Sequence, residues 1–320
     1  MTAALASEMR VLVLLVAACS GHSEPVSIDG AMASSGDAAA ADAAMPVTSM
    51  QLPIPPRQQW TNANGYCGET SIQSIALYDG AWISQKIVRQ LAGGELLLGV
   101  NEEAALNALH LAHVTWDSSA AQPQASAFLA WIETELLHGA PVVYGVYLTD
   151  AANDPDYDHI VPAVGVTPDQ LTSNDNYDDQ ITVPLATLAA TRSGCMRSTV
   201  QGGCVPRDVD YGVAITGVMD AQHASLPVSM TVTVDPEPNV STGAHAIAMT
   251  GTITASGLVA GHSYALLRFD GYAQLPADPT PAQLLAAASK RTDFTATAAS
   301  WTGSDTFQSD SATYFRCVAL

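Results

Sequence analysis

The chain has 320 residues, of which 48% are hydrophobic and 13% are charged, so it belongs to the globular proteins and not to the disordered ones. Its 31 acidic residues outnumber the 11 basic ones and give a formal net charge of -20. Such a charge repels phosphate backbones and anionic lipid surfaces, which argues against nucleic acid as a partner. The length predicts about two folded domains after an export segment and a linker.

Residues 1–19 have the pattern of an export signal. Arg10 precedes the apolar run 11–18, which is too short to span a bilayer and has the length of a signal-peptide hydrophobic region. The run ends in Val16-Ala17-Ala18-Cys19, which resembles the bacterial lipobox. The resemblance implies lipidation of Cys19 and a lipid anchor in the cell envelope. The outer membrane is favoured because Ser20 follows the cysteine, in place of the Asp that resembles an inner-membrane retention signal. The alternative is an ordinary signal peptide and a secreted chain, with Cys19 incidental.

Residues 20–50 consist mainly of Ala, Ser, Asp and Gly with scattered Pro, and they show no hydrophobic period. This composition predicts a flexible tether without chemistry of its own, and an Ala-rich helix is the alternative. We place the first folded domain at residues 51–219 and the second at 220–320.

The first domain is predicted to begin with helices. Asn64-Gly65 forms a turn, and apolar residues at 72, 75 and 76 give one buried face to a helix over 68–78, with Cys67 at its N-terminal end. Further helices are predicted after Ser84 and Asn101, and over 128–136.

Short β-branched runs after Pro141 predict strands at 142–147, 160–166 and 181–183. Helices followed by antiparallel strands predict an α+β layout. From about residue 220 the sequence alternates in the manner of an all-β sandwich, and the segment 258–264 resembles immunoglobulin-like and fibronectin-like modules. Its strands are predicted at 228–234, 246–254, 264–269, 294–301 and 314–318.

Cys67 and His159 form a candidate nucleophile and base. A thiolate attacks an acyl carbon far better than a thiol does, and the N-terminus of a helix lowers the pKa of a thiol placed there. His159 opens an apolar strand, from which an imidazole can accept the thiol proton and deliver it to the leaving amine. Polar side chains that could orient this imidazole follow shortly downstream, at Asn174, Asp175 and Asn176.

The oxyanion of a tetrahedral intermediate needs hydrogen-bond donors. The backbone N–H of Cys67 can supply one, and a side-chain amide just upstream can supply another. Gln58 and Gln59 are both available for this role.

The order of these motifs resembles that of the bacteriocin-processing type of papain-like cysteine peptidase. Gln59, Cys67-Gly68, Asp158-His159 and Asn174-Asp175 carry the resemblance, which covers about residues 51–215. It implies a papain-like fold with Cys67 as nucleophile, His159 as base, Asp175 as orienting carboxylate and Gln59 as oxyanion donor. The spacing from Gln59 to Cys67 is longer than in the family, so Gln58 or Asn62 is an alternative donor, and Asn174 is an alternative orienting group.

Five cysteines are divided among different roles in an oxidising compartment. Cys195 and Cys204 bracket a short loop and are the natural disulfide pair. Cys317 is expected to be a small buried residue in the last strand, and its pairing with Cys195 or Cys204 is the alternative.

Two patterns that could suggest metal ions are incomplete. His110 and His113, on a predicted helix, have no acidic or cysteine partner at a zinc-ligand spacing. The acidic run 150–158 lacks the loop glycine and the distal Glu of a calcium-binding EF-hand. We therefore expect neither a metal nor another cofactor.

These features predict an exported cysteine peptidase or amidase that acts on a peptide or protein substrate and meets the membrane only through its lipid anchor. One alternative is a catalytically inactive papain-like lipoprotein that binds peptides or an envelope partner. Another is acyl transfer to an amine, as in transglutaminase-like proteins.

Overall fold

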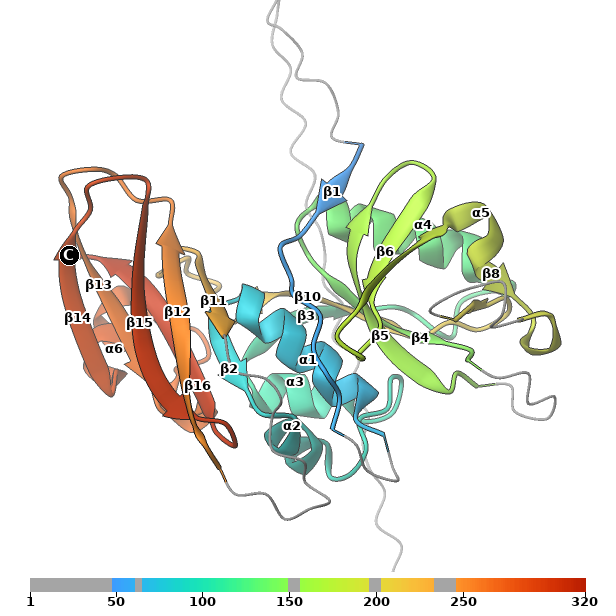
Figure 1. Ribbon diagram of the computed structural model, residues 1–320, viewed down its shortest axis with the longest axis horizontal. Coiled ribbons are helices and arrows are strands. Elements are labelled where there is room, and N and C mark those ends of the chain that lie inside the picture. Colours follow the sequence, from blue (N-terminus) through green and yellow to red (C-terminus); the bar gives the residue numbers. More distant parts are fainter. Residues whose placement is uncertain (1–47, 61–64, 149–155, 196–202, 233–245) are drawn as a thin grey trace, which may run out of the picture. The chain divides into compact units, whose positions relative to one another are not determined.

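The computed structural model describes residues 48–60, 65–148, 156–195, 203–232 and 246–320 (Figure 1). The predicted export signal, Cys19 and nearly all of the predicted tether lie outside the described residues. Within the described part, no helix is both long enough and apolar enough to cross a membrane.

The described chain has a mixed α and β structure with antiparallel sheets, in agreement with the predicted α+β layout. The predicted start of the second helix is confirmed, since the Ser84 side chain accepts a hydrogen bond from the backbone N–H of Lys86 (3.3 Å). The helices are α1 (Cys67–Tyr78), α2 (Gln85–Ala92), α3 (Glu102–Ala108), α4 (Ala125–Leu137), α5 (Leu185–Leu188) and α6 (Pro281–Ala287).

The largest sheet has the strand order β3-β10-β4-β5-β6-β7, and β1 also pairs with β5. Every position of β5 is buried, and both α1 and α4 contact this strand, which explains its unbroken apolar run. The strands are β1 (Met50–Gln51), β3 (Leu111–Thr115), β4 (Val142–Val146), β5 (His159–Val166), β6 (Gln170–Asn174), β7 (Gln180–Pro184) and β10 (Gly212–Val218). Two short strands, β8 (Ala189–Ala190) and β9 (Val205–Pro206), pair with each other in parallel.

Two smaller sheets share a second hydrophobic core, to which Ile253 and Phe307 contribute from one sheet and Leu266 and Phe315 from the other. Their strand orders are β11-β12-β15 and β14-β13-β16-β2. Strand β2 comes from the helical part of the chain and pairs with the last strand, so hydrogen bonds cross the domain boundary predicted at residue 220. The strands are β2 (Ala81–Ile83), β11 (Val228–Val232), β12 (Ala248–Ser256), β13 (Ser263–Phe269), β14 (Lys290–Thr295), β15 (Ser300–Gln308) and β16 (Ala312–Ala319).

Two local predictions were wrong. The segment 294–301 is not one strand, because the chain turns after β14 and crosses to the other sheet as β15. Phe294 and Trp301 stack across this turn with ring centroids 4.6 Å apart. His110 and His113 are not helical: His110 occupies a turn with φ 56°, and His113 lies in β3, a strand that the helical interpretation missed.

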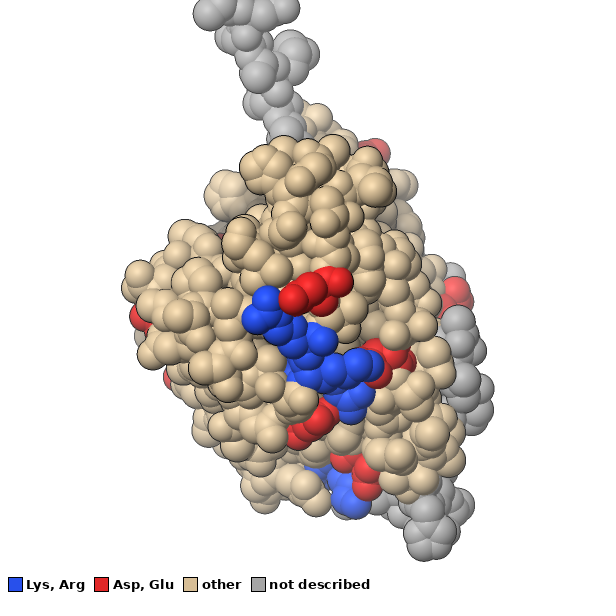
Figure 2. Space-filling view, turned by 90° about the vertical axis from the view of Figure 1, so that its left-hand side faces the viewer, with Lys and Arg blue, Asp and Glu red and all other residues tan. Residues whose placement is uncertain are grey.

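Basic side chains gather on the face that lies at the left of Figure 1, where acidic side chains border them (Figure 2). Ion pairs on β13, β14 and β15 account for this arrangement, since Asp305 pairs with both Arg268 and Lys290, at 3.0 Å each. Arg291 pairs with Asp293 in the same way. These pairs neutralise the basic charges of this face locally.

Candidate active site

Cys67 is the first residue of α1 and is half-buried. The residue after it must be small, because a Cβ at Gly68 would lie 2.8 Å from Cδ2 of Leu96 and 3.1 Å from its carbonyl oxygen. Glycine at this position thus lets the loop between α2 and α3 pack directly on the first turn of α1.

Burial raises the pKa of the Cys67 thiol to about 11. The backbone N–H groups of Ile160 and Gly68 lower it, and the charge of Glu69 raises it. Desolvation therefore raises the pKa of the thiol by more than the N-terminus of the helix lowers it. Ile160, whose main chain lowers the pKa of the thiol, directly follows His159 in β5.

His159 is the first residue of β5, and only 6% of its surface is exposed. Its Nε2 atom lies 3.4 Å from the carbonyl oxygen of Asp175, and its ring stacks on that of Tyr177 with centroids 6.2 Å apart. In the tautomer that carries its proton on Nε2, this contact is a hydrogen bond, because a carbonyl can only accept. The neutral imidazole then has its basic lone pair on Nδ1.

Asn176 connects the cysteine to the histidine strand. Its Nδ2 atom donates to the carbonyl oxygens of Ile160 (2.6 Å) and Cys67 (3.1 Å), and it lies 3.3 Å from the Ser71 hydroxyl. The residue is fully buried and adopts a left-handed backbone conformation, with φ 66°. One amide therefore fixes the first turn of α1 against the start of β5.

Asp175 and Asn174, the two predicted orienting residues, make other contacts. The Asp175 carboxylate accepts hydrogen bonds from the backbone N–H groups of Tyr177 (2.7 Å) and Asp179 (3.2 Å). Its contact with His159 uses the main-chain carbonyl, not the carboxylate assigned by the resemblance. The Nδ2 atom of Asn174 lies 3.3 Å from the Ile54 carbonyl oxygen.

Gln59 lies beside this loop. Its backbone N–H donates to the carbonyl oxygen of Asn176 (2.8 Å), and its side-chain amide donates to the Tyr177 hydroxyl (3.0 Å). The other candidate, Gln58, forms an isolated bridge with Tyr177, and its carbonyl oxygen accepts a hydrogen bond from Gln85 (3.0 Å). Asn62 lies outside the described residues.

Tyr177 was missed by sequence reasoning. Its ring stacks on His159, its hydroxyl accepts from Gln59, and 48% of its surface is exposed. A signal was present in the sequence, because the residue follows the Asn-Asp-Asn triplet that had been singled out.

Glu69, also missed, holds the first turn of α1. Its carboxylate pairs with Arg89 (2.7 Å) and accepts a hydrogen bond from the backbone N–H of Leu96 (3.1 Å). Burial raises the pKa of Glu69, while the bonded guanidinium lowers it. The same guanidinium lies 3.4 Å from the centroid of the Tyr66 ring.

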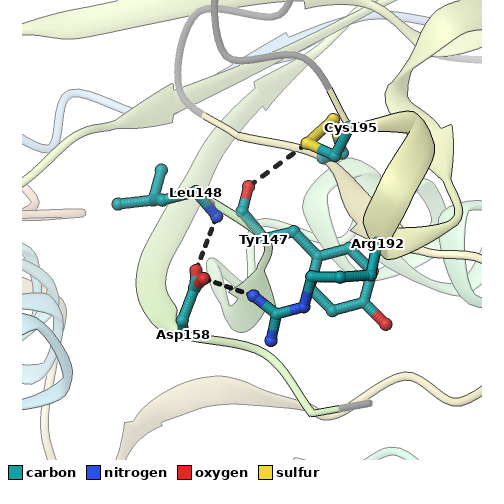
Figure 3. Close-up of a disulfide and its surroundings, with 6 residues drawn as sticks. Tyr147, Leu148, Asp158, Arg192 and Cys195 are labelled. Atoms are coloured by element: carbon teal, nitrogen blue, oxygen red, sulfur yellow. Dashed lines mark hydrogen bonds and ion pairs between the residues drawn. A yellow bond between two sulfur atoms is a disulfide. The ribbon is translucent and has the colours of Figure 1, made fainter. Parts of the chain in front are cut away.

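The predicted disulfide between Cys195 and Cys204 is confirmed, and Figure 3 shows its surroundings. Arg192 lies over the Tyr147 ring, 4.3 Å from its centroid, and pairs with Asp158. Asp158 directly precedes His159 and also accepts a hydrogen bond from the backbone N–H of Leu148 (2.5 Å). The disulfide segment thereby supports the chain that leads into β5.

A cavity of about 980 Å³ lies at the other end of α1, beside Asp79 and Arg316. The described part of the chain contains no group of three or more side chains placed to ligate a metal ion. No protein-family model matches the sequence, and the curated proteins contain no significant relative.

Proposed function

We propose that the chain is an exported cysteine hydrolase of papain-like type, which cleaves a peptide or amide bond with Cys67 as nucleophile and His159 as base. The observation that carries this proposal is the link between α1 and β5. The Asn176 amide donates to the carbonyl oxygens of both Cys67 and Ile160, and Ile160 directly follows His159. The site thus has the nucleophile at a helix start and the imidazole at a strand start, as in papain-like enzymes.

The raised pKa of Cys67 decides how the reaction must begin. A thiol with a pKa of about 11 is protonated at neutral pH, so the thiolate forms when Nδ1 of His159 takes the proton during attack. The sulfur then bonds to the acyl carbon, and the carbonyl π electrons move to its oxygen. The C–N bond breaks as the imidazolium returns its proton to the leaving amine. Water, deprotonated by His159, then attacks the thioester carbon. The C–S bond breaks, the carboxylic acid is released, and the imidazolium returns its proton to the Cys67 sulfur.

We propose two hydrogen-bond donors for the oxyanion formed during attack. The backbone N–H of Cys67 belongs to the first turn of α1, where N–H groups have no acceptor within the helix. The amide nitrogen of Gln59 carries two hydrogens, and one of them binds the Tyr177 hydroxyl. The second hydrogen is the one we assign to the oxyanion.

The second candidate function is a catalytically inactive cleft that binds peptides. The raised pKa of Cys67 favours it, because a buried thiol without proton transfer is a poor nucleophile. In either case we propose that Cys19 carries the lipid anchor and that residues 220–320 form an immunoglobulin-like or fibronectin-like module that positions substrate or partner.

Alkylation by iodoacetamide at pH 7, with mass spectrometric location of the label, distinguishes the two functions. The reference is Cys67 itself in the His159→Ala variant, because the fully buried Cys317 is shielded from the reagent whatever its pKa. If His159 takes the thiol proton, Cys67 is labelled at least about tenfold faster in the parent chain than in His159→Ala.

His262→Ala is the matched control, since His262 is exposed in the turn before β13 and should leave the rate unchanged. An equal rate for Cys67 in the parent chain and in His159→Ala would mean that access alone governs labelling. The hydrolase proposal would then be abandoned in favour of the peptide-binding cleft.

A further inference from the structure

The cavity at the C-terminal end of α1 is separate from the Cys67 site. Its walls come from the end of α1, from β10 and β11, and from β16, all of which are labelled in Figure 1. Its volume of about 980 Å³ is at the upper end of the range for small-molecule sites. None of the residues of the proposed active site lines it.

Asp79 places a carboxylate in this cavity. The residue follows the last residue of α1, and its Oδ2 atom is buried without a hydrogen-bond partner among the described residues. Gly217 faces the other carboxylate oxygen, and even an added Cβ there would remain 4.0 Å away. A buried carboxylate without a donor is costly, and the negative end of a helix adds to that cost.

The neighbouring charged groups do not supply the missing donor. Arg316 donates to the carbonyl oxygen of Asp79 and to the Ser225 hydroxyl, at 3.2 Å each. Its charge lowers the pKa of the Asp79 carboxyl, but it donates no hydrogen bond to that carboxylate. Asp220 is fully engaged, because it accepts hydrogen bonds from the backbone N–H groups of Ala224 (2.7 Å) and Ser225 (2.8 Å) and from the Ser225 hydroxyl.

The balance of charge in the cavity is negative. Asp79, Asp220 and Asp278 line it, and Arg316 is the only Lys or Arg among the lining residues. The remaining wall includes apolar side chains such as Leu226 and Val228. Such a cavity favours a ligand with one positively charged donor group and an apolar remainder.

We infer that this cavity binds a small organic cation with a primary ammonium group, whose N–H donates to the Asp79 carboxylate while its carbon chain contacts the apolar wall. The ligand supplies the donor that the protein lacks at this carboxylate. The inference does not depend on hydrolysis at Cys67.

Isothermal titration of the full chain with pentylammonium, in an amine-free buffer at pH 8, tests this inference. 1-Pentanol is the matched neutral probe, since it has the same chain and no charge. Pentylammonium should bind the parent chain, and Asp79→Asn should weaken it by about tenfold or more, as expected when a charge-assisted hydrogen bond is lost. Asp293→Asn, which alters an exposed carboxylate on β14, should leave the affinity unchanged.

Thermal unfolding of Asp79→Asn separates this role from a purely structural one. The amide keeps the shape of the carboxylate and removes a buried charge whose desolvation outweighs its attraction to Arg316, so the melting temperature at pH 8 should be equal to or higher than that of the parent. The inference fails if pentylammonium binds no better than 1-pentanol, or equally well to Asp79→Asn. A lower melting temperature without any effect of the cation would show Asp79 to be only an electrostatic partner of Arg316.

Discussion

Asp210 is fully buried, and neither oxygen of its carboxyl group has a hydrogen-bond partner among the described residues. Burial, followed by the charge of Asp208, raises its pKa from an ordinary value of 3.8 to about 7. The folded protein therefore keeps a proton that the unfolded chain loses between about pH 4 and pH 7. This contribution to stability is complete below pH 4 and is lost as the pH rises through about 7.

Asp210→Asn should make the free energy of unfolding less dependent on pH. Relative to the parent, the variant should gain stability between pH 4 and pH 8 by up to roughly 4 kcal/mol, since one pKa unit corresponds to about 1.4 kcal/mol. Urea unfolding at both pH values measures this. Asp79 titrates in the same range but is present in both proteins, so its effect cancels. If the free energies of unfolding of the parent and the variant changed with pH in parallel, Asp210 would be ionised in the folded protein without a large loss of stability.

Sequence order was enough to propose the principal residues of the candidate site. Cys67 could be placed at a helix start and His159 at a strand start, because turn residues and hydrophobic periods are local signals. The contacts of the 174–176 triplet could not be foreseen, because they depend on how the loop folds. The left-handed backbone at Asn176 directs its amide to α1 and β5, and the Asp175 carboxylate is used within its own turn.

The disulfide segment illustrates stabilisation at the scale of an element. Cys195 and Cys204 are nine residues apart, so their bond closes a short loop and is expected to contribute about 2 to 3 kcal/mol. The double variant Cys195→Ala/Cys204→Ala should lower the free energy of unfolding by this amount, as measured in urea. A reductant should destabilise the parent similarly and leave the double variant unaffected. An unchanged midpoint in both experiments would contradict a stabilising role.

Local signals also explain which elements could be predicted. The helix after Ser84 follows from its N-cap, and the core strand β5 follows from its β-branched run. The segment 294–301 was misassigned because its alternating apolar and polar residues continue through a turn. Strand β3 was missed because residues 109–114 also fit a helical period.

Strand β2 shows what the sequence could not reveal at the scale of the whole molecule. Its three residues are too few to predict a strand, yet they pair with β16, more than 200 positions later in the chain. Trp82 is fully buried in the core of the two smaller sheets, and its indole N–H donates to the Ser309 carbonyl oxygen (3.1 Å). In the opposite direction, the Tyr314 hydroxyl donates to the carbonyl oxygen of Leu109 (2.8 Å).

These contacts predict that the helical part and the C-terminal strands unfold together. The full chain should show one cooperative thermal transition, whereas a chain ending at residue 219 should show none, because it leaves β2 and its buried tryptophan without partners. Trp82→Ala should destabilise the full chain by about 3 to 5 kcal/mol, as expected for loss of a buried aromatic side chain. Trp301→Ala, which alters a partly exposed tryptophan of β15, is the comparison and should cost less. The opposite result would be a chain ending at residue 219 that unfolds cooperatively at the melting temperature of the full chain. That result would establish the predicted boundary as that of an independent domain, and the pairing of β2 with β16 would then not be needed for folding.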